Sequence, residues 1–212
     1  MKCVILNFNR LLLTKNTVEW CLKHSLEPVI IDNASDYQPL LDYYSSKPCE
    51  VLRLDRNYGH KVLWEQWLFR KLGITDRYLL TDPDLDLSGV PDDFLQVMHE
   101  GLDRYPVFDR IGLSLEIDDL PNNDLGRSVY KHEIRFWNNP LDSLYYEAEV
   151  DTTFALHKIT NYNTYNSLRV GKPYTARHLP WYYTDFNSLS DDEKNYFQTA
   201  NNSFSWKDRI IS

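Results

Sequence analysis

Short apolar runs alternate with longer stretches of helical periodicity along the first hundred residues. Continuous apolar runs predict buried β-strands at residues 3–8, 29–31, 51–54 and 78–80. Apolar residues spaced three and four apart predict helices at residues 14–24, 36–44, 62–71 and 91–103. Strands that alternate with helices indicate an α/β fold with a mostly parallel central sheet and helices on both faces.

Polar residues follow these predicted strands where each strand ends. Asn7, Asp32, Asn57 and Asp82 lie at or just past the four carboxyl ends. In open parallel sheets the ligand crevice lies outside the carboxyl ends of the strands. We therefore expect these four side chains to converge on one edge of the sheet.

The pattern is less regular after residue 104. Residues 111–115 predict a strand, residues 121–126 a loop rich in Asn and Asp, and residues 170–181 a strand followed by a loop. Residues 145–156 fit no single element, and a short helix is expected after residue 187. The sequence shows no internal repeat and no low-complexity tract.

Composition narrows the class of protein. A chain of 212 residues suits one domain, and 14% aromatic residues argue against disorder. A formal charge of -8 argues against a nucleic-acid partner, which needs a basic face. The three cysteines lack metal-ligand spacing and favour a reducing compartment. With no signal region and no apolar run near the ~20 residues of a membrane span, we expect a soluble, cytoplasmic protein or a domain of a larger one.

The cluster Asp82, Asp84 and Asp86 has four interpretations. A solvated turn after a strand is the simplest, because Asp and Pro are common there. A calcium loop of the EF-hand kind matches these three carboxylates, but Leu87 stands where Gly is needed and Asp93 where Glu is needed.

Two further interpretations assign chemistry to the cluster. In haloacid-dehalogenase-like phosphatases one Asp attacks phosphorus and its neighbour handles the proton, but that motif follows the first strand of its domain, whereas Asp82 follows the fourth. In the fourth interpretation the cluster binds a divalent cation that neutralises a diphosphate.

Four separated segments favour the fourth interpretation because of their order and spacing. The segments are residues 4–10 (VILNFNR), 29–35 (VIIDNAS), 56–59 (RNYG) and 80–84 (LTDPD). Together they resemble glycosyltransferases of the GT-A fold, particularly the family-2-like group. In the second half, residues 150–156 and 176–182 are similar to segments of some small family-2-like proteins, whereas the usual Glu-Asp pair of the acceptor side has no obvious match.

The resemblance implies a single GT-A-like domain with a nucleotide-binding half at residues 1–104 and an acceptor-side half at residues 105–212. It also implies transfer of a sugar from a nucleotide-diphosphate donor, a UDP- or GDP-sugar, to a saccharide or glycan acceptor. Mn²⁺ or Mg²⁺ would serve as cofactor. In this arrangement Asp84 binds the cation directly, Asp82 contacts the ribose or the cation through water, and His178 completes the cation shell, since imidazole suits Mn²⁺ better than Mg²⁺. Asp86 is expected either to support the cation ligands without contacting the cation or to be solvated.

The remaining expected contacts lie along the donor and the acceptor. The residues expected to bind the nucleotide-sugar besides Asp82 are Asn7, Asn9, Arg10, Asp32, Asn57, Gly59 and Lys61. Asp32 either accepts a base N–H or serves a turn, and Gly59 either admits the nucleotide to the backbone or only makes a turn.

Asp151 is the candidate base for the acceptor hydroxyl, with Glu149 as the alternative. Trp181, Tyr182 and Tyr183 either form a wall for a sugar or pack in the core. Two other functions remain open: a non-catalytic nucleotide- or sugar-binding domain, and a sugar nucleotidyltransferase. The absence of a Gly-rich, Lys-containing loop after the first strand argues against the latter.

Overall fold

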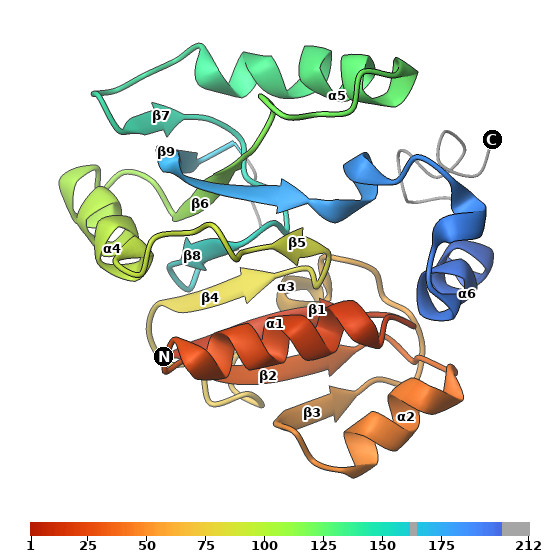
Figure 1. The fold of residues 1–212 in the computed structure, drawn as a ribbon. Coiled ribbons are helices and arrows are strands. Elements are labelled where there is room, and N and C mark those ends of the chain that lie inside the picture. Colours follow the sequence, from red (N-terminus) through yellow and green to blue (C-terminus); the bar gives the residue numbers. More distant parts are fainter. Residues whose placement is uncertain (162–164, 201–212) are drawn as a thin grey trace.

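The computed structural model of the protein describes residues 1–161 and 165–200 (Figure 1). The elements up to residue 104 are β1 (Lys2–Asn7), α1 (Leu12–Lys23), β2 (Glu27–Asp32), α2 (Gln38–Ser45), β3 (Glu50–Arg53), α3 (Val62–Glu65), β4 (Tyr78–Thr81), β5 (Leu85–Asp86) and α4 (Phe94–Arg104). The later elements are β6 (Arg110–Leu115), α5 (Asp124–Glu133), the 3-10 helix η1 (Ile134–Trp137), β7 (Tyr145–Glu147), β8 (Ala155–His157), β9 (Ser167–His178), the 3-10 helices η2 (Leu179–Tyr182) and η3 (Phe186–Ser188), and α6 (Asp191–Thr199).

One central sheet runs through the described residues in the order β3-β2-β1-β4-β8-β6-β9-β5, with β7 paired to β9. Strands β1 to β4 are mutually parallel and β6 pairs with β9 in parallel, whereas β5, β7 and β8 are antiparallel to their neighbours. Asn7 and Asp32 lie opposite each other at the carboxyl ends of β1 and β2. The predicted α/β class with a mostly parallel sheet is confirmed.

Alternating side chains bury both faces of the sheet. Cys3 and Ile5 of β1 pack in clusters that include residues of α1, α2 and α4, whereas Val4 and Leu6 pack against residues 62–74. In Figure 1, α1 and α4 lie in front of the sheet and α3 lies behind it. Strands that are apolar on both sides need cover on both faces, which explains their continuous apolar runs.

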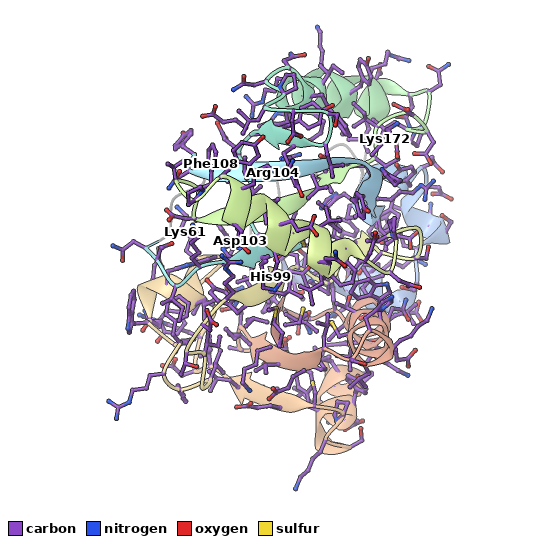
Figure 2. All side chains as sticks on the ribbon, turned by 90° about the vertical axis from the view of Figure 1, so that its left-hand side faces the viewer. Lys61, His99, Asp103, Arg104, Phe108 and Lys172 are labelled. Atoms are coloured by element: carbon purple, nitrogen blue, oxygen red, sulfur yellow. The ribbon has the colours of Figure 1, made fainter. Side chains whose placement is uncertain are left out.

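Ion pairs connect helix α4 to its surroundings at the end of the sheet opposite the carboxyl ends of β1 and β2. Arg77 Nη2 lies 2.5 Å from Asp103 Oδ1, and Arg104 Nη1 lies 2.9 Å from Asp142 Oδ2. Figure 2 views this end of the molecule and labels Asp103 and Arg104 on the helix. Exposed pairs of this kind contribute little to stability, so the packing of the apolar face of α4 holds it in place.

Two predicted elements differ from the structure. The helix expected at residues 62–71 is helical only at Val62–Glu65 and continues as turns. Trp67 has a φ of 47°, a left-handed conformation that ends a helix, and the residue is 55% exposed. The loop expected at residues 121–126 is wrong beyond Asn123, because the Asn123 side chain accepts the Gly126 N–H at 2.8 Å and begins α5.

The other predictions for the second half agree with the structure. The ambiguous stretch at residues 145–156 contributes β7 and the start of β8, and the strand expected from residue 170 lies within β9. The short helix expected after residue 187 is α6. None of the helices in the described ranges is both long enough and apolar enough to cross a membrane.

Helix α6 packs at the carboxyl edge of the sheet, on the side to which β2, β3 and β4 point in Figure 1. The Asp192 carboxylate accepts the backbone N–H groups of Leu11 and Leu12 at 2.8 and 2.7 Å. Leu11 stands at the N-cap of α1, and its side chain makes no capping hydrogen bond. Asp192, far along the chain, supplies the cap instead. The cap fixes α6 beside the strand ends that carry the polar residues.

Candidate active site

A cleft of about 930 Å³ opens at the carboxyl edge of the sheet, which is the size of a cofactor or nucleotide site. It receives residues from β-strand ends, from the loop after β3, and from the second half of the chain. The predicted site residues that line it are Asn7, Arg10, Asn57, Gly59, Lys61, Asp82, Asp84, Glu149, Asp151 and His178. The convergence of strand ends on one crevice follows from the parallel register of β1, β2 and β4.

Asp82 and Asp84 lie on the turn that follows β4, and the second half of the chain holds both in place. The Asp82 N–H donates to the Thr152 carbonyl oxygen at 3.0 Å, and Thr152 Oγ1 donates to Asp82 Oδ2 at 2.5 Å. The Asp84 carbonyl oxygen accepts the Leu179 N–H at 2.9 Å. These bonds orient two carboxylates that a free turn would leave mobile.

Asp84 contacts two basic side chains in a buried network. Its Oδ2 lies 2.5 Å from Arg10 Nη1 and 3.5 Å from His178 Nε2. Arg10 is only 3% exposed and also pairs with Glu193 of α6, with its Nε 3.1 Å from Oε1 and its Nη2 donating to Oε2 at 3.2 Å. The guanidinium carbon lies 3.7 Å from the centre of the Tyr196 ring. The guanidinium is therefore held by two carboxylates and an aromatic face.

The pKa values of the two neighbouring carboxylates are shifted in opposite directions. Burial and the nearby charge of Asp84 raise the pKa of Asp82 well above its ordinary value. Burial alone would raise the pKa of Asp84 as well, but His178 and Arg10 outweigh burial and lower it. Negative charge on Asp82 is thus poorly compensated, and a cation bound at the cleft floor would stabilise it.

A divalent cation fits this site only in part. Within residues 1–161 and 165–200, no three His, Cys, Asp or Glu side chains are grouped so that they could hold a metal ion. His178 Nδ1 is buried without a hydrogen-bond partner, but its Nε2 faces the Asp84 oxygen that Arg10 also binds. Mg²⁺ and Mn²⁺ in phosphate sites take one or two carboxylates and complete their shell with water and phosphate oxygens. The residues therefore fit a cation that is shared with a diphosphate, and not one enclosed by protein alone.

Asp32 and Asn9 are not among the residues that line the cleft. The fully buried Asp32 carboxylate accepts hydrogen bonds from Ser35, from Tyr44 OH at 3.1 Å and from Arg53 Nε at 3.2 Å. Its oxygens support the loop after β2. The neighbouring Asn33 lines the cleft instead.

Asn9 also supports this loop. Its φ is 52°, and its Oδ1 accepts the backbone N–H groups of Asp36 and Tyr37 at 2.9 and 3.1 Å.

Asn7, in contrast to Asp32 and Asn9, is among the residues that line the cleft. Its Nδ2 donates to Tyr44 OH at 2.8 Å, while its Oδ1 is buried with no hydrogen-bond partner. That oxygen is an acceptor suited to a ligand N–H.

A buried ion pair on the second-half wall of the cleft was not predicted. Arg169 Nη1 lies 2.8 Å from Glu133 Oε2, and Arg169 Nε donates to the Glu149 carbonyl oxygen at 2.8 Å. Both side chains of the pair are almost fully buried and line the cleft. The only signal in the sequence is an Arg inside the apolar run of residues 168–170, where a charge needs a partner.

The three aromatic residues expected to form a wall divide in their roles. Trp181 lines the cleft, and its ring centre lies 4.7 Å from that of His178. Tyr182 OH donates to Asp119 Oδ1 at 2.7 Å, and Tyr183 OH donates to Glu193 Oε2 at 3.1 Å.

Asp86 is not among the residues that line the cleft. Its Oδ1 accepts the Ser88 N–H at 2.9 Å.

A scan against protein-family models and a search of curated proteins each found no match. Among solved structures, the chain is similar to a mannosyltransferase from Pyrobaculum calidifontis in complex with GDP-Man and Mn²⁺, with a TM-score of 0.46 and 15% identity over 74% of this chain and 44% of that chain. It is also similar to a UDP-glucose pyrophosphorylase complexed with UDP-glucose, with a TM-score of 0.40 and 14% identity over 80% of this chain and 73% of that chain. The chain thus spans less than half the length of the mannosyltransferase chain. Fold and site together define an α/β protein with a polar cleft at the carboxyl edge of its sheet.

Proposed function

We propose that the protein is a glycosyltransferase of the GT-A type that moves a sugar from a nucleotide-diphosphate donor to an acceptor hydroxyl with the help of a divalent cation. The observation that carries this proposal is the pair Asp82 and Asp84 at the floor of a nucleotide-sized cleft. Burial and, after it, the nearby charge of Asp84 raise the pKa of Asp82, so a negative charge at this position is poorly stabilised by the protein alone. A cation brought with a diphosphate supplies the missing positive charge.

The first-half wall of the cleft suits the nucleotide. Asn7 Oδ1 offers an acceptor for a base N–H, and Asn33 and Asn57 provide amide groups nearby. Gly59 has a φ of 80°, which a residue with a side chain rarely adopts, so the loop depends on glycine at this point. Lys61 lies in the same lining and adds positive charge for the phosphates.

The second-half wall suits the acceptor. Asp151 and Glu149 line the cleft there, and Asp151 is close enough to the acidic pair for its charge to raise the pKa of Asp82. We assign Asp151 as the base that takes the proton from the acceptor hydroxyl, with Glu149 as the alternative. When bound, the cation would neutralise the charge that develops on the leaving diphosphate.

Thermal unfolding with UDP- and GDP-sugars, with and without Mn²⁺, tests the proposal directly. A ligand that binds the folded state raises the midpoint by an amount set by its affinity. We expect one donor class to raise the midpoint more with Mn²⁺ than without, and Asp84→Ala to remove that difference. No stabilisation by any donor would contradict the proposal.

Product analysis then separates the alternatives. Release of the nucleoside diphosphate that is lost in Asp151→Asn but kept in Glu149→Gln supports transfer with Asp151 as base. Donor binding without any turnover would identify a binding domain. Pyrophosphate formation from a nucleoside triphosphate and a sugar phosphate would identify a nucleotidyltransferase.

A further inference from the structure

Arg10 occupies the position at Asp84 where a cation would be expected. Its guanidinium contacts Asp84 Oδ2 at 2.5 Å, which is the shortest of the contacts that hold it, and both side chains are buried. Arginine stays protonated throughout the physiological range. The acidic floor of the cleft therefore carries a permanent positive charge of its own.

A divalent cation on Asp84 would lie within a few ångströms of this guanidinium. Like charges at that distance repel strongly where water is excluded. The protein alone should consequently bind the cation weakly. A diphosphate changes this balance, because a guanidinium binds phosphate oxygens as well as it binds a carboxylate.

The second anchor of Arg10 allows such an exchange. Glu193 holds the guanidinium from α6, and Asp192 of the same helix is fixed to the start of α1. Arg10 can therefore release Asp84 while it keeps Glu193 and the Tyr196 ring. The side chain would remain in the cleft and turn from the carboxylate to the phosphates.

We propose that Arg10 is a built-in counter-cation of Asp84 which gives way when the donor diphosphate arrives, so that the divalent cation and the donor bind cooperatively. This inference rests on the proposed function, since it needs a diphosphate and a cation in the same cleft. It makes Arg10 a donor-binding residue whose removal strengthens the binding of the cation alone and weakens the binding of the nucleotide. Purely structural ion pairs of Arg10 with Asp84 and Glu193 would not give this combination.

Mn²⁺ binding measured by electron paramagnetic resonance, with and without UDP or GDP, tests the proposal. For the wild-type protein we expect weak binding of Mn²⁺ alone and at least about tenfold tighter binding with the matching nucleotide. Asp84→Asn serves as the reference for Mn²⁺ bound only by the nucleotide. Arg10→Gln should bind Mn²⁺ alone about tenfold more tightly than wild type and should bind the nucleotide more weakly.

Two further variants guard against loss of folding in Arg10→Gln. In Glu193→Gln, Arg10 keeps Asp84 as its main anionic partner, so Mn²⁺ alone should bind more weakly than in wild type. Arg53→Gln is the matched control, because Arg53 pairs with the buried Asp32 at 3.2 Å outside the cleft lining. It should leave Mn²⁺ affinity unchanged.

The outcomes separate this inference from the proposed function. Tight binding of Mn²⁺ by wild type without nucleotide, or unchanged or weaker binding in Arg10→Gln, overturns the role of Arg10 while the transferase remains. If Arg10→Gln does not fold, unchanged or tighter Mn²⁺ binding in Glu193→Gln overturns it. Failure of wild type to bind UDP or GDP even with Mn²⁺ overturns both.

Discussion

The two walls of the cleft are built in different ways. The wall from residues 1–104 consists of strand ends and the turns that follow them, so Asn7 and Asp82 reach the cleft because of where their strands stop. The wall from the later residues depends on pairs that are distant in sequence. Thr152 holds Asp82, and Glu193 holds Arg10. The local sequence pattern of strands and turns therefore indicates that a site lies at the edge of the sheet. Contacts between residues distant in sequence determine which charged groups of that site are paired.

Asp84 is where the two walls meet, and its replacement should have the largest effect. Asp84→Ala removes the carboxylate that faces Arg10 and His178, so we expect donor turnover to fall by about 100-fold or more. Release of the nucleoside diphosphate measures this. Asp86→Ala is the matched control, since that carboxylate serves a turn outside the cleft lining, and equal losses in both variants would contradict a special role for Asp84.

The ion pair of the later wall can be broken without touching the acidic floor. Glu133→Ala leaves Arg169 buried without its carboxylate partner, which should lower the free energy of unfolding by about 3 kcal/mol. Urea denaturation measures the loss. Asp124→Ala removes an exposed partner of Arg127 and a carboxylate in the first turn of α5, and should cost much less than Glu133→Ala.

A compensating double variant sharpens the same test. Glu133→Leu combined with Arg169→Met replaces the buried pair by apolar side chains and should recover most of the stability lost in Glu133→Ala. If the double variant is no more stable than Glu133→Ala, the pair acts through more than charge compensation.

The sequence predicted the first wall better than the second for a physical reason. Parallel strands of continuous apolar residues must end at a common edge, so Asn7, Asn57, Asp82 and Asp84 could be placed there from their positions alone. The same rule selected Asp32, which lies at the edge. Its carboxylate oxygens, however, accept hydrogen bonds that support the loop after β2. Position along a strand does not show which neighbours a side chain will meet.

The second wall gave weaker signals. Glu133 and Glu193 lie on helices of ordinary composition, and nothing local marks them as partners of buried arginines. Long-range pairing also escapes prediction within residues 1–104, where the contact of Arg10 with Asp84 joins residues 74 positions apart. The prediction of a metal ligand at Asp84 could not include this contact, because it depends on how the turn after β1 meets the turn after β4.

Thr152 provides a smaller test of how the later wall supports the earlier one. Thr152→Val removes the hydroxyl that donates to Asp82 Oδ2, so the carboxylate loses part of its orientation. We expect about tenfold weaker binding of Mn²⁺ in the presence of UDP or GDP, as is usual when a partner of a metal ligand is removed. Thr152→Ser keeps the hydroxyl and should restore the affinity. Equal affinities of wild type and Thr152→Val would show that backbone contacts alone position Asp82.

The opposite pKa shifts of Asp82 and Asp84 give the prediction with the smallest expected effect, and it is specific to these two residues. The raised pKa of Asp82 means that the unfolded chain ionises first as the pH rises above 3.8, so the folded state loses stability in that window. Asp82→Asn should therefore be more stable than wild type at pH 7 without divalent cations, and the difference should vanish below pH 3.8. Asp84 has a lowered pKa and stabilises the fold above pH 3.8, so Asp84→Asn should be less stable at pH 7.

Urea denaturation at pH 7 and at acidic pH, in the presence of a chelator, measures both differences. Asn keeps the shape of Asp and can still accept the Thr152 hydroxyl, so the comparison isolates charge. Two residues that are separated only by Pro83 should then shift stability in opposite directions. Loss of stability in both variants would mean that Arg10 neutralises the two carboxylates together, so that Asp82 would not need a cation. A gain in both would mean that Arg10 and His178 do not compensate the charge of Asp84.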